Sequence, residues 1–406
     1  MANRQHTIGL DISDRSINIL ELDVSGAVVI YGRTLLTSGI VKDGVIADKE
    51  RFKAELSQAL AKTAPVSLTG ERIQAYACVP GSKLLTYYFE VPDDIPDADV
   101  ASYITKQASS MIPFPFSDLC SDYILIEGDS RKEVLFAAAQ KELVADYIDL
   151  YHACGIEVVL MGGELFSLGR ALLSTVPKDT TLIVDFGTRA TDIGVFDRDG
   201  IVRMSLSIPF GGEKITDILA KELKLAPEEA EEKKMQQGLA KRKSKSGVSY
   251  IIRQAMRELT DELRETVDYF VKQKTIPITH ILLTGGTAML PGVAEYIEEC
   301  VGIKTTIGDP FKAINADQLR NAGVPPIAFA NVIGLALRGL LHDTPGVDLR
   351  ECKFALPESK ESPKTIDAKI SHLIVKGTYT KSQLVLGVFF MAAACALLIF
   401  ALINFL

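Results

Sequence analysis

Residues 181–192 read TLIVDFGTRATD, and residues 7–18 read TIGLDISDRSIN. Each stretch is an apolar run that ends in an aspartate, Asp185 or Asp11, and continues through a short turn into a second run. Short apolar runs bounded by turn residues are typical of buried strands. The same strand-turn-strand opening therefore occurs twice, far apart in the chain, which indicates two related lobes.

Strand-like and helical runs alternate around these openings, which predicts mixed α/β lobes. The expected strands lie at 7–10, 16–23 and 72–79, and the expected helices near 48–61, 217–235 and 325–340. The helix over 217–235 is strongly charged, with Glu and Lys at spacings that pair along one face. Prolines between the two openings favour a small inserted subdomain. Within it, the aromatic rings of the run 112–116, IPFPF, form either a rigid core wedge or an edge that a partner recognises.

Composition limits the class of protein. A chain of 406 residues, 47% hydrophobic and 24% charged, is too long for one compact core and too apolar to be disordered. Its formal net charge of -8 argues against a nucleic-acid partner, and the basic run 241–245 is expected as a solvated loop. The six cysteines are scattered, without metal-ligand spacing, and are expected as small core residues of a reducing compartment.

The C-terminal run 384–406 carries no charged residue. As a helix it would be about 34 Å long at about 1.5 Å per residue, enough for a hydrocarbon core of about 30 Å. Lysines precede the run, and no signal peptide is apparent at the other end, so the body is expected in the cytoplasm. We therefore expect a linker over 341–381 and a single transmembrane helix over 382–406 that tethers the chain to the inner membrane.

Three turns carry the residue types that a bound phosphate chain needs, which are backbone N–H groups facing the anion and carboxylates for hydrated magnesium. After Asp11, the segment 13–16 can bend and bind phosphate. After Asp185, Gly187 allows close approach of the backbone and Thr188 offers a hydroxyl. The third element, residues 281–292 (ILLTGGTAMLPG), is a strand, a paired-glycine turn and a helix start, which suits an adenosine. Each element alone also fits an ordinary chain connection.

In this order and spacing, the three elements resemble the phosphate-1, phosphate-2 and adenosine motifs of the actin, heat-shock chaperone and sugar-kinase superfamily. Further segments are similar to the PilM family of type IV pilus assembly ATPases and to its relative FtsA; they are residues 77–82, 112–115, 134–144, 208–216 and 229–234. The resemblance covers residues 7 to about 340. It implies an actin-like two-lobed ATPase with duplicated ribonuclease-H-like lobes. The first lobe would span 1–181, including an inserted subdomain about 84–163, and the second 182–340, including a nucleoside-side subdomain about 213–280.

The resemblance implies ATP and Mg²⁺ as ligands. Asp11 and Asp185 would face the magnesium through water. The other implied nucleotide-binding residues are Ser13, Arg15, Ser16, Gly187, Thr188, Gly211, Gly212, Glu213, Glu231, Lys234, Gly285, Gly286 and Thr287. Glu164 would orient the attacking water, unless it is simply a helix N-terminal carboxylate.

The first loop departs from the family pattern. Ser13 replaces a glycine, and Asp14 with Arg15 replace small residues. We expect the extra carboxylate near the phosphates to weaken nucleotide binding unless Arg15 compensates.

The function that the resemblance implies is an ATP-binding, membrane-tethered scaffold of a type IV pilus or related secretion platform, with slow hydrolysis or none. Lobe closure would change the surface for a bitopic, PilN-like partner. Self-association is left open. An FtsA-like division protein is disfavoured because FtsA uses an amphipathic C-terminal helix, whereas this tail is apolar all round. A small-molecule kinase would need an acceptor pocket that we cannot identify, and a pseudo-ATPase without nucleotide remains an alternative.

Overall fold

The computed structural model describes residues 5–127, 132–176, 178–239, 246–341 and 346–350. The predicted transmembrane helix, most of the predicted linker and the basic run 241–245 therefore lie outside the described residues. Within the described ranges, no helix has both the length and the apolar character to cross a bilayer. All the described residues belong to one compact unit, Met1–Phe354.

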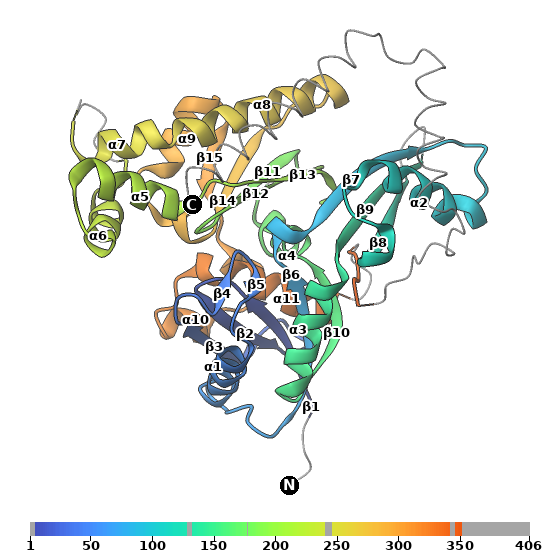
Figure 1. Ribbon diagram of the computed structural model, residues 1–406, viewed down its shortest axis with the longest axis horizontal. Coiled ribbons are helices and arrows are strands. Elements are labelled where there is room, and N and C mark those ends of the chain that lie inside the picture. Colours follow the sequence, from blue (N-terminus) through green and yellow to red (C-terminus); the bar gives the residue numbers. More distant parts are fainter. Residues whose placement is uncertain (1–4, 128–131, 177, 240–245, 342–345, 351–406) are drawn as a thin grey trace, which may run out of the picture. The chain divides into compact units, whose positions relative to one another are not determined.

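Two five-stranded sheets form the framework of this unit (Figure 1). The first sheet contains β1 (Gln5–Ile12), β2 (Ser16–Leu22), β3 (Val28–Leu35), β6 (Arg72–Val79) and β10 (Ile156–Gly163). The second contains β11 (Thr181–Phe186), β12 (Thr191–Phe196), β13 (Val202–Ile208), β14 (His280–Thr284) and β15 (Lys304–Ile307). Their orders are β10-β6-β1-β2-β3 and β15-β14-β11-β12-β13. In each sheet three antiparallel strands are followed by two parallel ones, so the two sheets have the same topology.

Two helices, α4 (Glu164–Leu172) and α11 (Ala330–Leu340), pack against each other between the sheets. Helix α11 contacts β1 and β2, whereas α4 contacts β11 and β12. The two helices approach so closely that a Cβ atom on Gly334 would collide with the Ser167 backbone. Buried side chains from both sheets, such as Leu20 and Ile183, join these helices in one apolar cluster. This shared core positions the turns after β1 and β11 relative to each other.

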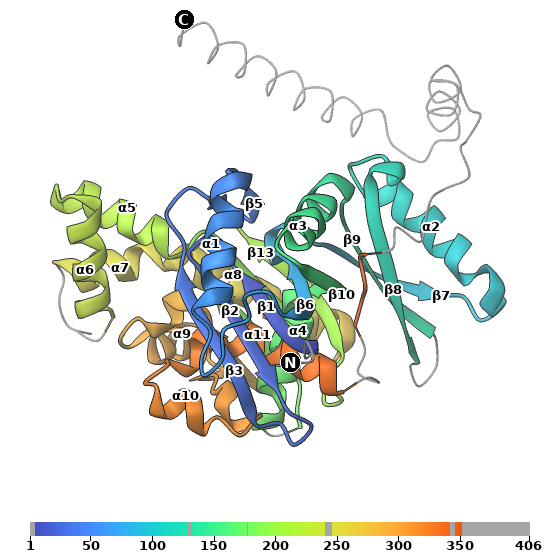
Figure 2. The ribbon, with the colours of Figure 1, turned by 90° about the horizontal axis from the view of Figure 1, so that it is seen from below.

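Further elements lie around the two sheets (Figure 2). On the first sheet these are α1 (Lys49–Ala61), α3 (Lys141–Ala153) and the hairpin β4 (Val41–Lys42) and β5 (Val45–Ile46). Beside the second sheet lie α5 (Gly212–Leu223), α6 (Pro227–Gln237), α7 (Val248–Ala255), α8 (Arg257–Lys274), η5 (Gly286–Met289) and α9 (Val293–Val301). Helix α10 (Asp317–Asn321) contacts β3 of the first sheet.

The single helix expected over 217–235 is wrong. Lys224 takes a left-handed conformation with φ of 54° and ends α5. Pro227 then begins α6. Proline has no backbone N–H, and the N–H groups of a first helical turn have no partner within the helix, so proline is tolerated at this position. The predicted pairing of Glu with Lys lies wholly within α6, where Lys233 pairs with Glu229 at 3.5 Å and Lys234 with Glu231 at 2.6 Å.

A separate three-stranded sheet, β7 (Leu85–Val91), β9 (Lys132–Gln140) and β8 (Leu119–Glu127), is covered by α2 (Val100–Met111). Phe116 is only 5% exposed and its ring centroid lies 5.9 Å from that of Phe136, whereas Phe114 is 40% exposed. Phe116 is therefore a core wedge. Among the described cysteines, Cys120 in β8 is disulfide-bonded and the other three are free thiols, so the expectation of unbridged core cysteines is wrong at Cys120.

The segment 346–350, which we call the strap, packs beside β10. The Leu349 N–H donates to the Met161 carbonyl at 2.8 Å, and the Met161 N–H donates to the Asp348 carboxylate at 3.2 Å. The Asp348 N–H donates to Asp122 in β8, and the side chains of Val347 and Leu349 are buried. The beginning of the expected linker over 341–381 is therefore packed against both the first sheet and the three-stranded sheet.

Candidate functional site

One cleft gathers the turns after β1, β11 and β14 together with the β4–β5 turn. The predicted residues that line it are Asp11, Ser13, Arg15, Ser16, Glu164, Asp185, Gly187, Thr188, Gly285 and Gly286. The lining shown by the structure does not include Gly211, Gly212, Glu213, Glu231, Lys234 or Thr287. The folded chain thus unites the three predicted turns. Several residues expected around the nucleoside contact the turn after β11 directly, since the Gly212 N–H donates to the Gly187 carbonyl at 3.1 Å and the Glu213 N–H to the Thr188 carbonyl at 2.8 Å. Their contact with a nucleotide stays a prediction.

The second group contains a polar support for the turn after β11, in which Lys234 is buried and Glu231 is half exposed. The Lys234 ammonium donates to the Gly212 carbonyl at 2.9 Å and pairs with Glu231 at 2.6 Å. The Thr287 hydroxyl donates to the Gly187 carbonyl at 2.8 Å, and a Cβ atom on Gly212 would collide with that hydroxyl. These residues fix the backbone of the turn that faces the cleft.

Six carboxyl groups line the same cleft, and four of them, from Asp11, Glu164, Asp185 and Asp192, have raised pKa values. Burial raises the pKa of Asp11. Burial, with the charges of Asp192 and Asp11, raises the pKa of Asp185 to about 7, and burial raises the pKa of Asp192 to about 6. The pKa of Glu164 is raised well above its usual range by burial and by the neighbouring aspartates. These carboxyl groups would be favoured in their charged form by a bound cation.

Asp192 was not predicted as a site residue. It lies opposite Asp185 in the β11–β12 register, as Asn18 lies opposite Asp11 in the β1–β2 register. The repeat itself was the available signal, because equivalent positions of the two openings face the same cleft.

Two amides hold the Asp11 carboxylate. The Asn18 amide donates to Oδ2 at 2.9 Å, and the Asn331 amide of α11 donates to Oδ1 at 2.8 Å. The carbonyl oxygens of both amides are buried and lack a hydrogen-bond partner in the described structure. Carboxylate and amide oxygens are the ligands that Mg²⁺ prefers, so the residues present fit this ion. Cys78 also approaches Asp11 and Glu164, but burial raises the pKa of its thiol well above the usual range, which disfavours a thiolate ligand.

Glu164 begins α4 and also secures a chain connection. Its Oε2 accepts the Gly81 N–H at 2.7 Å, where β6 passes into the segment leading to the three-stranded sheet. A Cβ atom on Gly81 would lie 2.5 Å from the Asp192 carboxylate. Glu164 therefore holds this connection beside the buried acids, and its role toward an attacking water stays a prediction.

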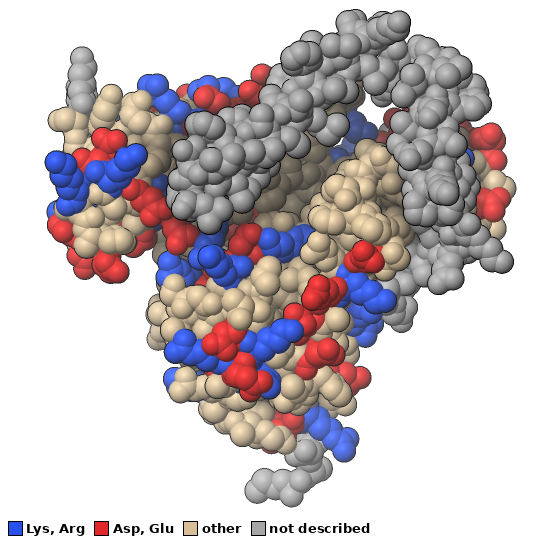
Figure 3. All heavy atoms as spheres, in the orientation of Figure 1, with Lys and Arg blue, Asp and Glu red and all other residues tan. Residues whose placement is uncertain are grey.

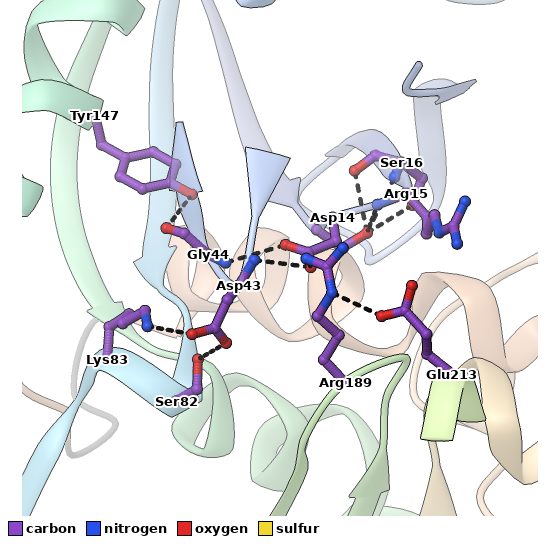
Figure 4. A network of polar contacts seen from close by, with 11 residues as sticks. Asp14, Arg15, Ser16, Asp43, Gly44, Ser82, Lys83, Tyr147, Arg189 and Glu213 are labelled. Carbon is purple, nitrogen blue, oxygen red and sulfur yellow. Dashed lines mark hydrogen bonds and ion pairs between the residues drawn. The ribbon is translucent and has the colours of Figure 1, made fainter. Parts of the chain in front are cut away.

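A polar network crosses the cleft at Arg189 (Figure 4). The Asp14 carboxylate accepts the N–H groups of Asp43 and Gly44, each at 3.0 Å. Arg189 lies in the turn after β11. An outer N–H of its guanidinium group donates to the Asp14 carboxylate, and its Nε–H donates to the Glu213 carboxylate at 2.8 Å.

Arg189, which the sequence did not single out, is thus the basic partner of Asp14. The side chain that pairs with Asp14 comes from the second lobe, whereas Arg15 is exposed at the edge of the same cleft. Compensation by Arg15 in nucleotide binding stays a prediction. A Cβ atom on Gly211 would collide with the Thr188 carbonyl, so this turn packs tightly against the start of α5.

Comparison with known families decides the relationship. The sequence model of the family "type IV pilus assembly protein PilM" matches residues 9–340. The chain belongs to the PilM family. This confirms the relationship expected from the sequence motifs, and the match ends before the strap.

Individual relatives of this PilM-family chain agree with that assignment. The cell division protein FtsA of Pseudomonas aeruginosa is 24% identical over 389 residues, which cover 84% of this chain and 91% of FtsA. The solved PilM-PilN type IV pilus biogenesis complex has a chain with a TM-score of 0.68 and 21% identity, covering 82% of this chain and 98% of that one. The ethanolamine utilization protein EutJ from Carboxydothermus hydrogenoformans has a TM-score of 0.50 and 17% identity, covering 81% and 88%. The chain has the α/β fold of the actin-like ATPases.

Proposed function

We propose that this PilM-family chain is an ATP-binding scaffold of the inner-membrane platform of type IV pili, or of a related secretion machine, whose partner binding depends on nucleotide. The observation that carries this proposal is the cleft, in which the two Asp turns and the paired-glycine turn surround buried carboxylate and amide oxygens. Hydrated Mg²⁺ would face Asp11 and Asp185 and supply the positive charge that these carboxylates and the phosphates require.

The remaining parts of a nucleotide have matching places. The phosphates would lie between the turns after β1 and β11, near Ser13 and Thr188. The adenosine would lie at Gly285 and Gly286, because a Cβ atom on Gly286 meets nothing within 4 Å. The open space at this glycine supports a ligand in close contact with the backbone.

Slow hydrolysis, or none, follows from the position of Glu164. Its carboxyl group already accepts the Gly81 N–H at 2.7 Å, and this contact competes with a water molecule for the same oxygen. Lobe movement around bound ATP, rather than turnover, would then regulate the partner surface.

The partner would be a bitopic, PilN-like membrane protein that docks beside the three-stranded sheet. The similarity to a chain of the solved PilM-PilN complex supports this choice.

The run 382–406 would tether the chain to the inner membrane, with the described body in the cytoplasm. On the face shown in Figure 3, acidic and basic side chains of the described residues are interspersed.

Calorimetry on the full chain in mild detergent tests the proposal. Mg-ATP should bind the wild type, and the Gly286→Phe variant should lose binding while its melting temperature without nucleotide stays close to that of the wild type. A PilN-like cytoplasmic peptide should bind with different affinities in ATP and in ADP. Absence of ATP binding to the wild type would establish the pseudo-ATPase alternative instead.

The tether has its own test. Deleting the residues after 381 should move the protein from the membrane fraction to the soluble fraction. If the truncated chain pelleted with membranes as strongly as the full chain in cells without the partner, the tether would be wrong.

A further inference from the structure

The arginines that line the cleft differ in what holds them. They are Arg15, Arg33 and Arg189. Arg15 is exposed, and Arg33 donates to a backbone carbonyl, that of Ala328, at 3.3 Å. Arg189 instead pairs with two acids, Asp14 of the first lobe and Glu213 of the second, and so spans the cleft (Figure 4).

Arg189 bridges two turns that line the cleft. It belongs to the turn after β11 and reaches the turn after β1, which are the two turns proposed to hold the phosphate chain. A guanidinium group binds phosphate oxygens through two parallel N–H bonds, with both geometric fit and charge. The oxygens of a third phosphate would therefore compete with the Asp14 carboxylate for the same guanidinium.

We propose that Arg189 distinguishes a nucleoside triphosphate from a diphosphate by exchanging Asp14 for the terminal phosphate. The inference rests on the proposed function, because it requires a nucleotide in this cleft. Without nucleotide, the Asp14 carboxylate keeps the guanidinium in place across the cleft. With ADP, no terminal phosphate is present and the Asp14 pair persists.

After the exchange, both Asp14 and Arg189 keep hydrogen-bond partners. Asp14 retains the N–H donors of Asp43 and Gly44 when the guanidinium leaves, so its carboxylate stays hydrogen-bonded. Glu213 can keep Nε of Arg189 while the outer nitrogens turn toward the phosphate. The side chains of Arg189 and Asp14 are 26% and 13% exposed, and partly exposed ion pairs contribute little net stability, so losing this pair costs little.

Asp14 is also connected to a second element through the β4–β5 turn. The Gly44 carbonyl accepts the Tyr147 hydroxyl at 3.1 Å, and Tyr147 belongs to α3, which contacts β8 and β9. The β4–β5 turn therefore lies between Asp14 and the helix that packs against the three-stranded sheet. The state of Arg189 is in this way connected to the subdomain beside which the partner is proposed to dock.

The test compares the dissociation constants for Mg-ATP and Mg-ADP, measured by calorimetry on the full chain in mild detergent. The wild type should prefer ATP. Arg189→Ala should lose this preference. Its dissociation constant should rise by about tenfold or more for Mg-ATP and change by less than about threefold for Mg-ADP. Asp14→Asn removes the competing carboxylate charge and should strengthen the binding of Mg-ATP but not that of Mg-ADP. The matched control is Arg198→Ala, because Arg198 is exposed and its ion pair is with the adjacent Asp199, outside the cleft lining.

Arg189→Lys covers the case in which Arg189→Ala fails to fold. Lysine keeps the charge without the planar fork and should give an intermediate preference. Equal weakening of ATP and ADP in Arg189→Ala, or an unchanged preference in both Arg189 variants, would overturn the inference while leaving nucleotide binding intact. A wild type that binds neither nucleotide would overturn the proposed function itself, and the two failures are therefore distinguishable.

Discussion

Replacing Asp185 by asparagine should change the stability of the chain in opposite directions with and without Mg-ATP. In the metal-free chain, burial and the charges of Asp192 and Asp11 raise the pKa of Asp185 to about 7, against about 3.9 for an unfolded aspartate. A difference of about three pH units, at about 1.4 kcal/mol each, gives an upper limit of about 4 kcal/mol for the cost of the buried charge. Asparagine has a similar shape and no charge. We expect Asp185→Asn to be more stable by about 1 to 4 kcal/mol at pH 8 in EDTA.

The pH dependence has a definite sign. Between pH 4 and 7 the unfolded chain has lost the Asp185 proton while the folded chain still holds it, so folding stability falls as the pH rises. Above pH 7 both states are ionised and this contribution is constant. The advantage of Asp185→Asn over the wild type should therefore be absent near pH 4, grow up to about pH 7 and then level off.

Mg-ATP should reverse the order. A ligand at about 1,000 times its dissociation constant stabilises the folded state by about 4.1 kcal/mol, and only the wild type should gain this amount. Urea denaturation of the full chain in mild detergent measures both effects, with Asp199→Asn, at an exposed site, as the control. A less stable Asp185→Asn at pH 8 in EDTA, or equal stabilisation of both proteins by Mg-ATP, would refute the reasoning.

Three further predictions concern the framework that holds the site. Gly334→Ala should lower the free energy of unfolding by about 1 to 3 kcal/mol because the new methyl group collides with α4; Gly286→Ala, with open space around it, should not, and equal effects would contradict the packing argument. Phe116→Ala should lose about 3 to 5 kcal/mol as a core wedge, whereas normal melting with lost binding of the PilN-like peptide would indicate a recognition edge. A chain ending at residue 345 should melt at a lower temperature than one ending at residue 350, because it lacks the buried side chains of Val347 and Leu349; equal melting temperatures would show that the strap does not stabilise the body.

The parts of the site that could be predicted from sequence are those encoded locally. A strand that ends at Asp11 or Asp185, and a paired-glycine turn at Gly285, depend on runs of neighbouring residues, and the structure brings all three to one cleft. The strand expected at 72–79 has those bounds as β6, because its period and its flanking residues lie within one short stretch. The repeated opening also predicted two related lobes, and the two sheets share one topology.

Other features depended on contacts that no local pattern specifies. Asn331 reaches Asp11 only because α11 packs on β1, and Arg189 meets Asp14 only because the shared core aligns the turns of two separate lobes. The contacts of Lys234 also depend on tertiary structure, because burial of a lysine requires acceptors and the Gly212 carbonyl and the Glu231 carboxylate supply them. The sequence by itself determined which turns could face a phosphate chain. Tertiary structure decided which charges meet across the cleft, because charge pairing depends on distances that only the packed helices between the sheets set.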